Sequence, residues 1–347
     1  MQQLEEARGF EDFSRYYRDK VYARLLSYLP VTKDESYNSM IHVYSERKGS
    51  YRRPSYLLLW TALFGGSVGE AMLPAAAQQA SEDWILVHDD IMDGNGVRRG
   101  LPSAHVMYGI PKAVNIGDGL HAISWKMAID AAQMLGGDRG KRYLNKFYDV
   151  ILTTHIGQHF DASLTADVRD ITKFTVDDYY RSVHAKSAYY SVYGPMQLGA
   201  IIAGVDDTTS DRIPNYGRPA GLAFQIADDI LDCTSTEAVL GKSIGNDVRE
   251  GAKTLILHHA VENASAADLQ RLKEIYWKKR EQKTEEDVHF VLDKFNELGS
   301  IDFVKHEAQK LIDEAARQFE LETKDILESH TKELARSAIG HTVKRNK

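Results

Sequence analysis

Apolar residues recur along this chain at the three- and four-residue spacing that is typical of α-helices. Two such stripes follow one another in the C-terminal part, at Val288, Val291, Leu292, Phe295 and Leu298 and then at Val304, Ala308, Leu311, Ile312, Ala315 and Phe319. Lys, Glu and Asp lie between the members of the second stripe, as in a helix that buries one face. Thr175 and Ser265 each precede a helical stretch and are candidate N-caps.

The same pattern indicates how the chain is organised. Its 347 residues allow one large domain or two ordinary ones. It has only 8 prolines, no persistent alternating pattern, and no stretch long and polar enough to be an interdomain linker. We therefore predict an all-α fold in which residues 1–347 form a large single-domain helical bundle with a central cavity.

Composition narrows the class of protein. A hydrophobic content of 43% is ample for a core, and a net charge of −7 argues against nucleic acid as a partner. The longest apolar stretches, around residues 57–64 and 196–203, are shorter than the roughly 18 to 20 residues that a transmembrane segment needs. The N-terminal sequence lacks the features of a secretory signal, and Cys233 is the only cysteine. We expect a soluble, cytoplasmic protein.

A short aspartate-rich pattern occurs twice, as Asp89-Asp90-Ile91-Met92-Asp93 and as Asp228-Asp229-Ile230-Leu231-Asp232. Each copy follows an apolar run, and helical spacing places its three carboxylates on one face. Like charges in apolar surroundings are unfavourable unless a cation binds them, and carboxylates suit Mg²⁺. Either copy alone is equally compatible with a solvated acidic helix face. Two copies predict facing patches that bind Mg²⁺ ions and, through them, a diphosphate.

Cationic residues accompany both motifs. Arg98 and Arg99 lie in a glycine-rich segment directly after the first motif, where paired guanidiniums suit phosphate contacts. Lys186-Ser187 follows an amphipathic stretch, and Gly241-Lys242 follows the second motif. Each of these cations alone is more often a surface charge, but together with the acidic motifs they are candidate diphosphate ligands.

With these motifs the chain resembles the trans-isoprenyl diphosphate synthases, also called the polyprenyl synthetase family, from about Lys48 to Thr254. Beyond the two acidic motifs, the resemblance rests on Arg98-Arg99-Gly100, Phe224-Gln225, Asn115-Ile116-Gly117-Asp118, Gly157-Gln158 with Asp161, and Gly241-Lys242 with Asp247. It implies the all-α isoprenoid synthase fold, usually homodimeric. It also implies that the protein joins an allylic diphosphate to isopentenyl diphosphate in an Mg²⁺-dependent reaction.

The resemblance also assigns roles to individual residues. It implies about three Mg²⁺ ions held mainly by Asp89, Asp93 and Asp228, with Asp90, Asp229 and Asp232 in support. The residues implied for the allylic diphosphate are Arg98, Lys186, Ser187, Gln225 and Lys242, of which Lys186, Gln225 and Lys242 are the candidate catalytic residues. Those implied for isopentenyl diphosphate are Arg53 and Arg99. No protein nucleophile is required, and no persuasive Ser-His-Asp or Cys-His arrangement is present in the sequence.

The sequence departs from the family on the acceptor side. In the segment Lys48–Pro54, Ser50 and Tyr51 stand where the family has a lysine and an arginine, although Arg53 is kept. Glu82 stands where the family has a histidine, and a carboxylate there repels a diphosphate. Neighbouring cations at Lys48, Arg52 and Lys253 are candidates to restore the charge. The basic end, residues 344–347, either folds over the acceptor phosphate or is a solvated tail.

Trp84, five residues before the first motif, is large enough to limit product length to C15–C20 by closing the cavity, or else it is an ordinary core residue. Three further alternatives remain beside the synthase. They are a same-fold prenyltransferase with a non-isopentenyl acceptor, a non-catalytic subunit of a heteromeric synthase, and a class I terpene cyclase, whose second metal motif the sequence does not match. The acceptor, the allylic substrate, the product length and the choice between homodimer and heteromer stay open at this point.

Overall fold

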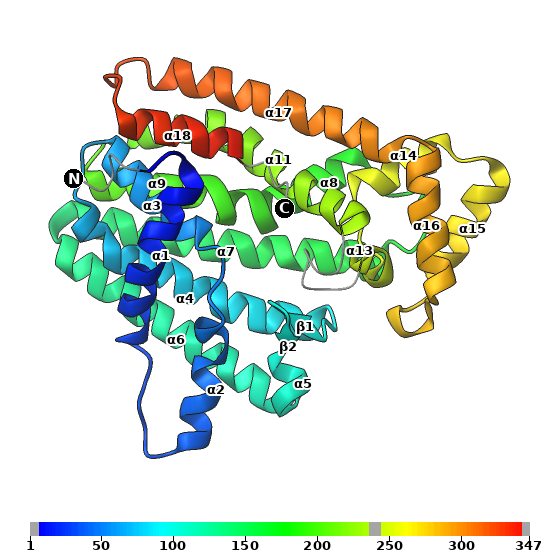
Figure 1. Cartoon of the computed structure of the whole chain (residues 1–347), viewed down its shortest axis with the longest axis horizontal. Coiled ribbons are helices and arrows are strands. Elements are labelled where there is room, and N and C mark those ends of the chain that lie inside the picture. Colours follow the sequence, from blue (N-terminus) through cyan, green and yellow to red (C-terminus); the bar gives the residue numbers. More distant parts are fainter. Residues whose placement is uncertain (1–6, 236–243, 342–347) are drawn as a thin grey trace. The chain divides into compact units, whose positions relative to one another are not determined.

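The computed structural model describes residues 7–235 and 244–341 and is almost entirely helical (Figure 1). Within these residues the only strands are β1 (Val97–Arg98) and β2 (Leu101–Pro102), which pair as an antiparallel hairpin. The prediction of an all-α fold is confirmed. In the described part of the chain, no helix combines the length and the apolarity that crossing a bilayer requires.

The chain divides into two compact units, each of which collects segments from distant parts of the sequence. The first unit comprises Met1–Val150, Ser191–Pro214 and Phe319–Ala338. The second comprises Ile151–Tyr190, Asn215–Gln318 and Ile339–Lys347. Since both units are assembled from segments that interleave along the sequence, no single linker separates them. The prediction of one domain stays a prediction.

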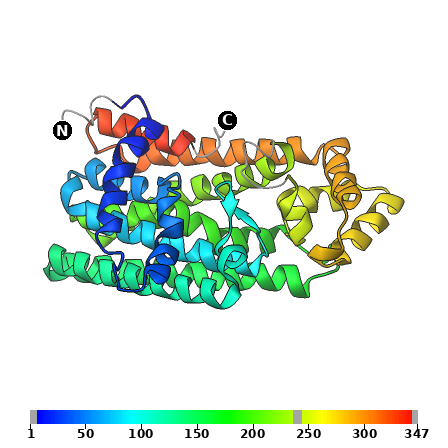
Figure 2. The same ribbon diagram turned by 60° about the horizontal axis from the view of Figure 1, so that its bottom comes forward.

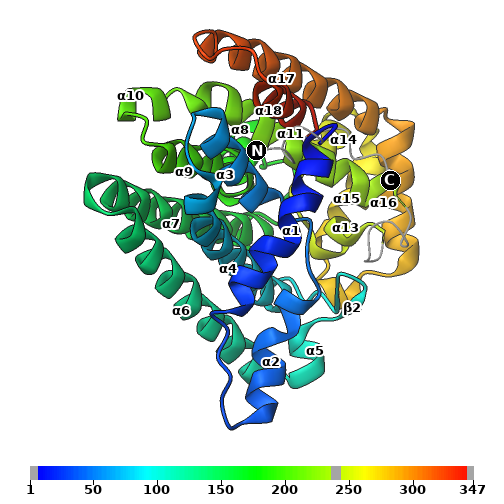
Figure 3. The ribbon, with the colours of Figure 1, turned by 60° about the vertical axis from the view of Figure 1, so that its left-hand side comes forward.

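The first unit is built around α4 (Val68–Met92), which contacts α1, α3, α6 and α9 and is therefore buried along most of its length. The other elements wholly in this unit are α1 (Phe10–Leu26), α2 (Glu35–Glu46), α3 (Arg52–Leu63), the hairpin, α5 (Ala104–Tyr108), α6 (Ile110–Leu135), α9 (Gly194–Ala203) and α10 (Asp207–Ser210). Small residues let neighbours approach α4 closely, since Ala75, Ala76, Ala77 and Ala80 are all fully buried. α6 and the first part of α7 (Gly137–Asp167) lie side by side (Figure 3).

The second unit contains α8 (Val176–Val183), α13 (Asn246–Glu250), α14 (Leu255–Asn263), α15 (Ala266–Trp277), the 3₁₀ turn η2 (Arg280–Gln282) and α16 (Glu285–Glu297). Helices α14, α15 and α16 lie close to one another, drawn in yellow and orange in Figure 2. Among the described residues, five helices have residues in both units, namely α7, the π-helix η1 (His184–Tyr193), α11 (Ile213–Thr234), α17 (Ser300–Glu322) and α18 (His330–His341).

Local signals in the sequence account for several of these helices. The two predicted C-terminal stripes lie on α16 and α17, and all their members are buried except Leu298 and Leu311, which are half-buried. The Thr175 side chain caps α8 and the Ser265 side chain caps α15, as predicted. At the end of α4, Asp93 is the C-cap and Gly94 takes a left-handed conformation with φ 65°, which turns the chain into the hairpin.

Candidate active site

The first acidic motif forms the last turn of α4, where the negative end of the helix dipole adds to the repulsion between its carboxylates. Asp90 is fully buried, whereas Asp89 and Asp93 are half-exposed. The Asp90 carboxylate accepts a hydrogen bond from the Tyr44 hydroxyl at 2.6 Å and one from Arg98 Nε at 2.9 Å, and a second Arg98 nitrogen also donates to it. Asp90 therefore positions Arg98, and Asp89 and Asp93 remain accessible to a cation.

Charge balance around Asp90 involves both of its partners. The Tyr44 hydroxyl is buried beside the Asp90 carboxylate, and burial together with this negative charge raises the pKa of Tyr44 to about 12. Arg98 supplies the compensating positive charge and also lies 3.6 Å from the Asp89 carboxylate. The first motif thus has a built-in counter-charge.

The second acidic motif lies in the last two turns of α11 and repeats this arrangement with one change. Asp229 is buried, and its carboxylate accepts a hydrogen bond from the Tyr179 hydroxyl at 2.8 Å and another from Gln225 Nε2 at 2.9 Å. Both donors are neutral, so burial raises the pKa of Asp229 to about 7. Asp228 is half-exposed.

Asp232, the last member of the second motif, has a structural partner. Its carboxylate is buried and accepts a hydrogen bond from the backbone N–H of Asp247 at 3.0 Å, while its carbonyl accepts one from Gly245. These bonds join the end of α11 to the start of α13. Within the second motif, Asp228 is therefore the carboxylate most accessible to a ligand.

Lys186 and Ser187, both half-exposed, lie on the π-helix η1. Lys186 Nζ lies 2.6 Å from a carboxylate oxygen of Asp161 on α7, and this contact orients the ammonium group. Gly157, one turn earlier on α7, allows the close approach, because a Cβ there would lie 2.2 Å from the Lys186 backbone nitrogen. π-Helical turns are frequent at functional sites because they reorient side chains. This element presents Lys186 and Ser187 in the second unit, which also holds Gln225.

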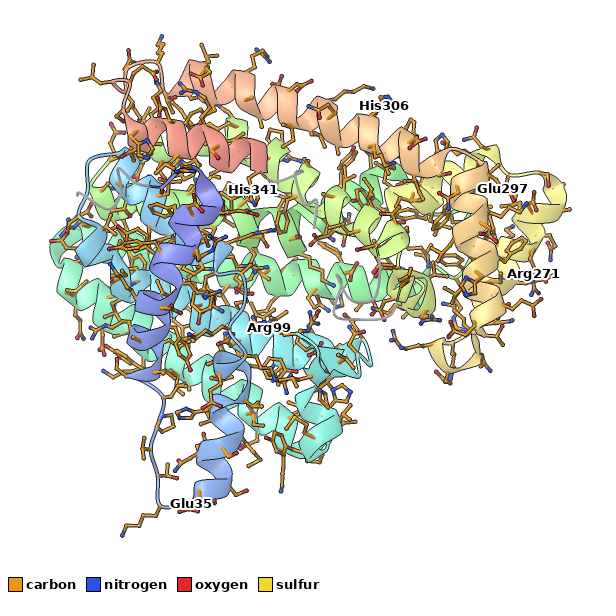
Figure 4. All side chains as sticks on the ribbon, in the orientation of Figure 1. Glu35, Arg99, Arg271, Glu297, His306 and His341 are labelled. Atoms are coloured by element: carbon orange, nitrogen blue, oxygen red, sulfur yellow. The ribbon has the colours of Figure 1, made fainter. Side chains whose placement is uncertain are left out.

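The acceptor candidates Arg53 and Arg99 both contact Glu82 in the first unit. Arg53 Nη1 lies 3.2 Å and Arg99 Nη2 lies 3.5 Å from the same Glu82 carboxylate oxygen, Oε1. Arg53 also donates to the Ser191 hydroxyl at 2.8 Å, and Arg99 donates to the carbonyl of Tyr44 at 3.0 Å. Arg99, which is labelled in Figure 4, lies in the turn between β1 and β2. Both predicted acceptor cations are thus already bound to a carboxylate of the protein.

The neighbouring cations proposed as replacements have other partners. Lys48 Nζ lies 2.8 Å from an Asp19 carboxylate oxygen. Lys253 is buried and donates to the Gly251 carbonyl at 2.8 Å, and burial lowers the pKa of its ammonium group to about 8. Lys242 and the basic end at residues 344–347 lie outside the described residues.

Trp84 is almost fully buried on α4 and packs against two imidazoles. Its ring centroid lies 4.6 Å from that of His121 and 5.9 Å from that of His88. The indole N–H of Trp125 donates to His121 Nε2 at 2.9 Å, which fixes the orientation of the His121 ring. These aromatic rings make Trp84 part of a rigid cluster between α4 and α6.

The two tyrosines that donate to Asp90 and Asp229 were not foreseen as site residues. Tyr44 lies 46 residues before Asp90, outside every motif, and nothing in the sequence indicates its contact. Tyr179 marks the start of the amphipathic stretch before Lys186, but its bond to Asp229 spans 50 residues. Asp161 belongs to a motif on which the resemblance rests, and its contact with Lys186 gives that motif a physical reason.

The carboxylates of the two acidic motifs are the type of ligand that Mg²⁺ prefers. In the described part of the chain, no three His, Cys, Asp or Glu side chains come together as a ready-made metal site. Mg²⁺ commonly binds to one or two carboxylates and completes its shell with water and substrate phosphate oxygens. The half-exposed Asp89 and Asp93 at one helix end, and Asp228 at another, fit that mode of binding.

Comparisons with known proteins show which proteins this chain is similar to. The sequence model of the family described as "Polyprenyl synthetase" matches residues 34–294. The geranylgeranyl diphosphate synthase of Sulfolobus acidocaldarius is 33% identical over 236 residues, which are 68% of this chain and 70% of that protein. The geranylfarnesyl diphosphate synthase of Aeropyrum pernix is 30% identical over 326 residues, 93% of this chain and 98% of that protein. The crystal structure of a geranylgeranyl pyrophosphate synthetase from Pyrococcus horikoshii superposes with a TM-score of 0.83 at 27% identity, covering 97% of this chain and 99% of that one.

Proposed function

This chain belongs to the polyprenyl synthetase family, and from that premise we propose that it is a prenyltransferase. It joins an allylic diphosphate to isopentenyl diphosphate head to tail and releases a C15–C20 trans-prenyl diphosphate. The observation that carries the proposal is the shared geometry of the two acidic motifs. In each one the middle aspartate is buried and bound to a tyrosine hydroxyl, while an outer aspartate remains accessible at the end of a long helix.

The accessible carboxylates Asp89, Asp93 and Asp228 are the proposed main Mg²⁺ ligands. Asp90, Asp229 and Asp232 support them from buried positions, where hydrogen bonds fix the last turns of α4 and α11. About three Mg²⁺ ions are expected once a diphosphate is bound. Bound Mg²⁺ neutralises the negative charge of the departing pyrophosphate.

Protein cations bind the same diphosphate. Arg98 is held by Asp90 and Lys186 by Asp161, so each charge is oriented before the substrate arrives. Ser187, Gln225 and Lys242 complete the proposed set for the allylic diphosphate. As the C–O bond of the allylic substrate breaks, charge develops on the leaving pyrophosphate, and donors fixed in advance stabilise that charge without reorganising.

The acceptor is proposed to bind through Arg53 and Arg99. Its alkene attacks the allylic cation and forms the new C–C bond, and the proton then lost from the adjacent carbon leaves the product alkene. Apolar walls protect the cation from water. Trp84 is a large, almost fully buried side chain on α4, five residues before Asp89, and it is the proposed residue that closes the space for the growing chain.

A substitution tests the role of Trp84. Trp84→Ala is expected to lengthen the product by at least one C5 unit, because it removes the indole that packs against His88 and His121. Chromatography of the extracted products measures this change. An unchanged product distribution would assign Trp84 to core packing alone.

We also propose that the protein is a cytoplasmic homodimer with no nucleic-acid partner. Large apolar side chains are exposed along α6, at Ile110, Val114, Ile129 and Met134. A second copy of the chain would cover such a face. Light scattering of the purified protein tests this, with twice the chain mass of 39.1 kDa as the expected result.

The proposed reaction is tested with purified protein, Mg²⁺, labelled isopentenyl diphosphate and, in turn, C5, C10 and C15 allylic diphosphates. Discrete C15 or C20 products, with one pyrophosphate released per bond formed, are expected. The ion pairs between Glu82 and both acceptor arginines favour one second candidate, a prenyltransferase that uses a different acceptor. That candidate predicts pyrophosphate release without chain growth. A folded protein that gives neither signal would support the non-catalytic subunit.

A further inference from the structure

Four charged side chains form a compact group in the first unit, here called the Glu82 cluster: Arg53, Glu82, Asp83 and Arg99. Their side chains are 20%, 7%, 0% and 16% exposed, respectively. Arg53 comes from α3, Glu82 and Asp83 from α4, and Arg99 from the turn of the hairpin. Three separate elements therefore bring these charges together.

The charges of the cluster nearly cancel. Glu82 Oε1 lies within 3.5 Å of both guanidiniums, and an Asp83 oxygen lies 3.8 Å from Arg99. Burial raises the pKa of Asp83 to about 6, which leaves this carboxylate largely ionised at neutral pH. Two positive charges thus face two negative charges. An anion that arrives here meets a pair of guanidiniums whose charge is already compensated.

Arg99 has little freedom to move away from Glu82. It occupies the turn of the hairpin with φ 55°, followed by Gly100 with φ 75°, as a tight two-residue turn requires. A Cβ on Gly49 would lie 2.5 Å from Arg99 Nη2, so the segment around residue 49 closes over the guanidinium. The Arg99 guanidinium is consequently held beside Glu82 Oε1.

Two buried polar atoms beside these ion pairs have no hydrogen-bond partner within the described residues. They are the Tyr51 hydroxyl and the second Glu82 oxygen, Oε2. Tyr51 is 1% exposed, and burial followed by the charges of Asp83 and Glu82 raises its pKa. Since a buried donor without a partner is costly, the Tyr51 hydroxyl is suited to donate to a phosphate oxygen of a bound acceptor.

We propose that Glu82 is a specificity-determining residue of this chain: its carboxylate competes with the acceptor diphosphate for Arg53 and Arg99. The inference rests on the proposed function, in which these two arginines hold the acceptor. To bind, the acceptor phosphate takes over the guanidinium donors that Glu82 now occupies, and the Tyr51 hydroxyl gains its partner. Glu82 thus weakens the binding of a highly charged acceptor without affecting the allylic site.

Glu82→Gln tests this directly, because it keeps the shape of the side chain and removes its charge. We expect the KM for isopentenyl diphosphate to fall about tenfold, which corresponds to about 1.4 kcal/mol. The KM for the allylic diphosphate and kcat should change less than about twofold. Glu70→Gln is the matched control, since it removes one negative charge from the same helix, where Glu70 pairs with Arg139 at 3.0 Å. It should leave all three constants unchanged.

The outcomes separate the inference from the proposed function. If Glu82→Gln leaves the acceptor KM unchanged or raises it while the wild type is active, Glu82 only holds the arginines in place and the inference is wrong. If the wild type releases pyrophosphate but does not extend the chain, the inference expects Glu82→Gln to gain extension, and no gain refutes it. A folded wild type that releases no pyrophosphate refutes the proposed function itself.

A second variant gives an independent test if Glu82→Gln fails to fold. Tyr51→Phe removes only the buried hydroxyl, so its melting temperature should equal or exceed that of the wild type. We expect the acceptor KM to rise about fivefold, with the allylic KM unchanged. An acceptor KM equal to that of the wild type would exclude Tyr51 from acceptor binding and overturn that part of the inference.

Discussion

The two acidic motifs share a sequence pattern but balance their charge differently. Asp90 and Asp229 are both buried, and each accepts a hydrogen bond from a tyrosine hydroxyl. The remaining donor is the Arg98 guanidinium in the first motif and the neutral Gln225 amide in the second. The pKa of Asp229 accordingly rises to about 7 because of its burial. The first motif thus has its own counter-charge, whereas the hydrogen bonds to the buried Asp229 of the second come from neutral donors.

The two motifs therefore differ in the interactions that hold them in place. Arg98 contacts both Asp89 and Asp90 and so fixes the first motif, which under the proposed function preorganises Asp89 and Asp93 for Mg²⁺. The second motif is held by neutral hydrogen bonds and by the backbone N–H of Asp247. We expect the second motif to gain most from Mg²⁺, because no guanidinium bonds to its buried Asp229 in the described structure.

The largest expected effect comes from removing an accessible carboxylate of either motif. Asp89→Asn and Asp228→Asn should each lower the rate of pyrophosphate release by about a thousandfold or more, since a proposed metal ligand is lost. Both side chains are half-exposed, so circular dichroism should show an intact fold. If one variant keeps its activity while the other loses it, only one motif binds the catalytic ions.

The next largest effect should come from removing Arg98 or Gln225, the side chains whose different charge distinguishes the two motifs. Arg98→Met leaves Asp90 buried without its guanidinium and should lower the free energy of unfolding by about 3 to 5 kcal/mol. Gln225→Met leaves Asp229, whose pKa is about 7, with only the hydrogen bond from the Tyr179 hydroxyl. It should lower the free energy of unfolding by about 1 to 3 kcal/mol. Urea denaturation at pH 7 measures both values. Equal losses would contradict the difference in charge balance.

A buried carboxylate outside the motifs provides a pH test. Burial raises the pKa of Asp83 from 3.8 to about 6, so between these pH values the folded state binds a proton that the unfolded chain does not. The free energy of unfolding should therefore decrease as the pH rises from about 4 to about 6, by up to about 3 kcal/mol for this group. Asp83→Asn should flatten that part of the stability profile. An identical profile in the variant would show that Asp83 is not the group responsible.

The smallest effects should come from the two tyrosines. Tyr44→Phe and Tyr179→Phe each remove one hydrogen bond to a buried aspartate. Each should lower the free energy of unfolding by about 1 to 2 kcal/mol. The two losses should be similar: Arg98 still binds Asp90 in Tyr44→Phe, but the Ala104 backbone N–H, which donates to the Tyr44 hydroxyl at 3.2 Å, loses its acceptor. Thermal unfolding of both variants measures these losses, and a loss in either one as large as that of Arg98→Met would contradict the expectation.

Much of the fold could be predicted because it follows from local pattern. The stripes on α16 and α17 repeat at helical spacing, and the caps at Thr175 and Ser265 have the residue types that bind free backbone N–H groups. The acidic motifs were visible for the same reason, since three carboxylates at this spacing share a helix face. The division into two units was not predicted, because contacts between distant segments define it.

The inner structure of the site was harder to predict. The sequence showed that Glu82 departs from the family pattern. It did not show that Arg53 and Arg99 contact the same Glu82 oxygen, because the three residues lie on separate elements. Tyr44 and Tyr179 lie 46 and 50 residues from their aspartates in the sequence. Such contacts depend on tertiary packing, which a single sequence does not encode in any short pattern.

A single incubation tests whether the two acidic motifs drive an Mg²⁺-dependent prenyl transfer. Wild-type protein is incubated with a C10 allylic diphosphate and labelled isopentenyl diphosphate, with Mg²⁺ in one sample and with EDTA in a parallel one. We expect labelled C15 or C20 product with Mg²⁺ and none with EDTA. Equal product in both samples, or neither product nor pyrophosphate from folded protein with Mg²⁺, would contradict it.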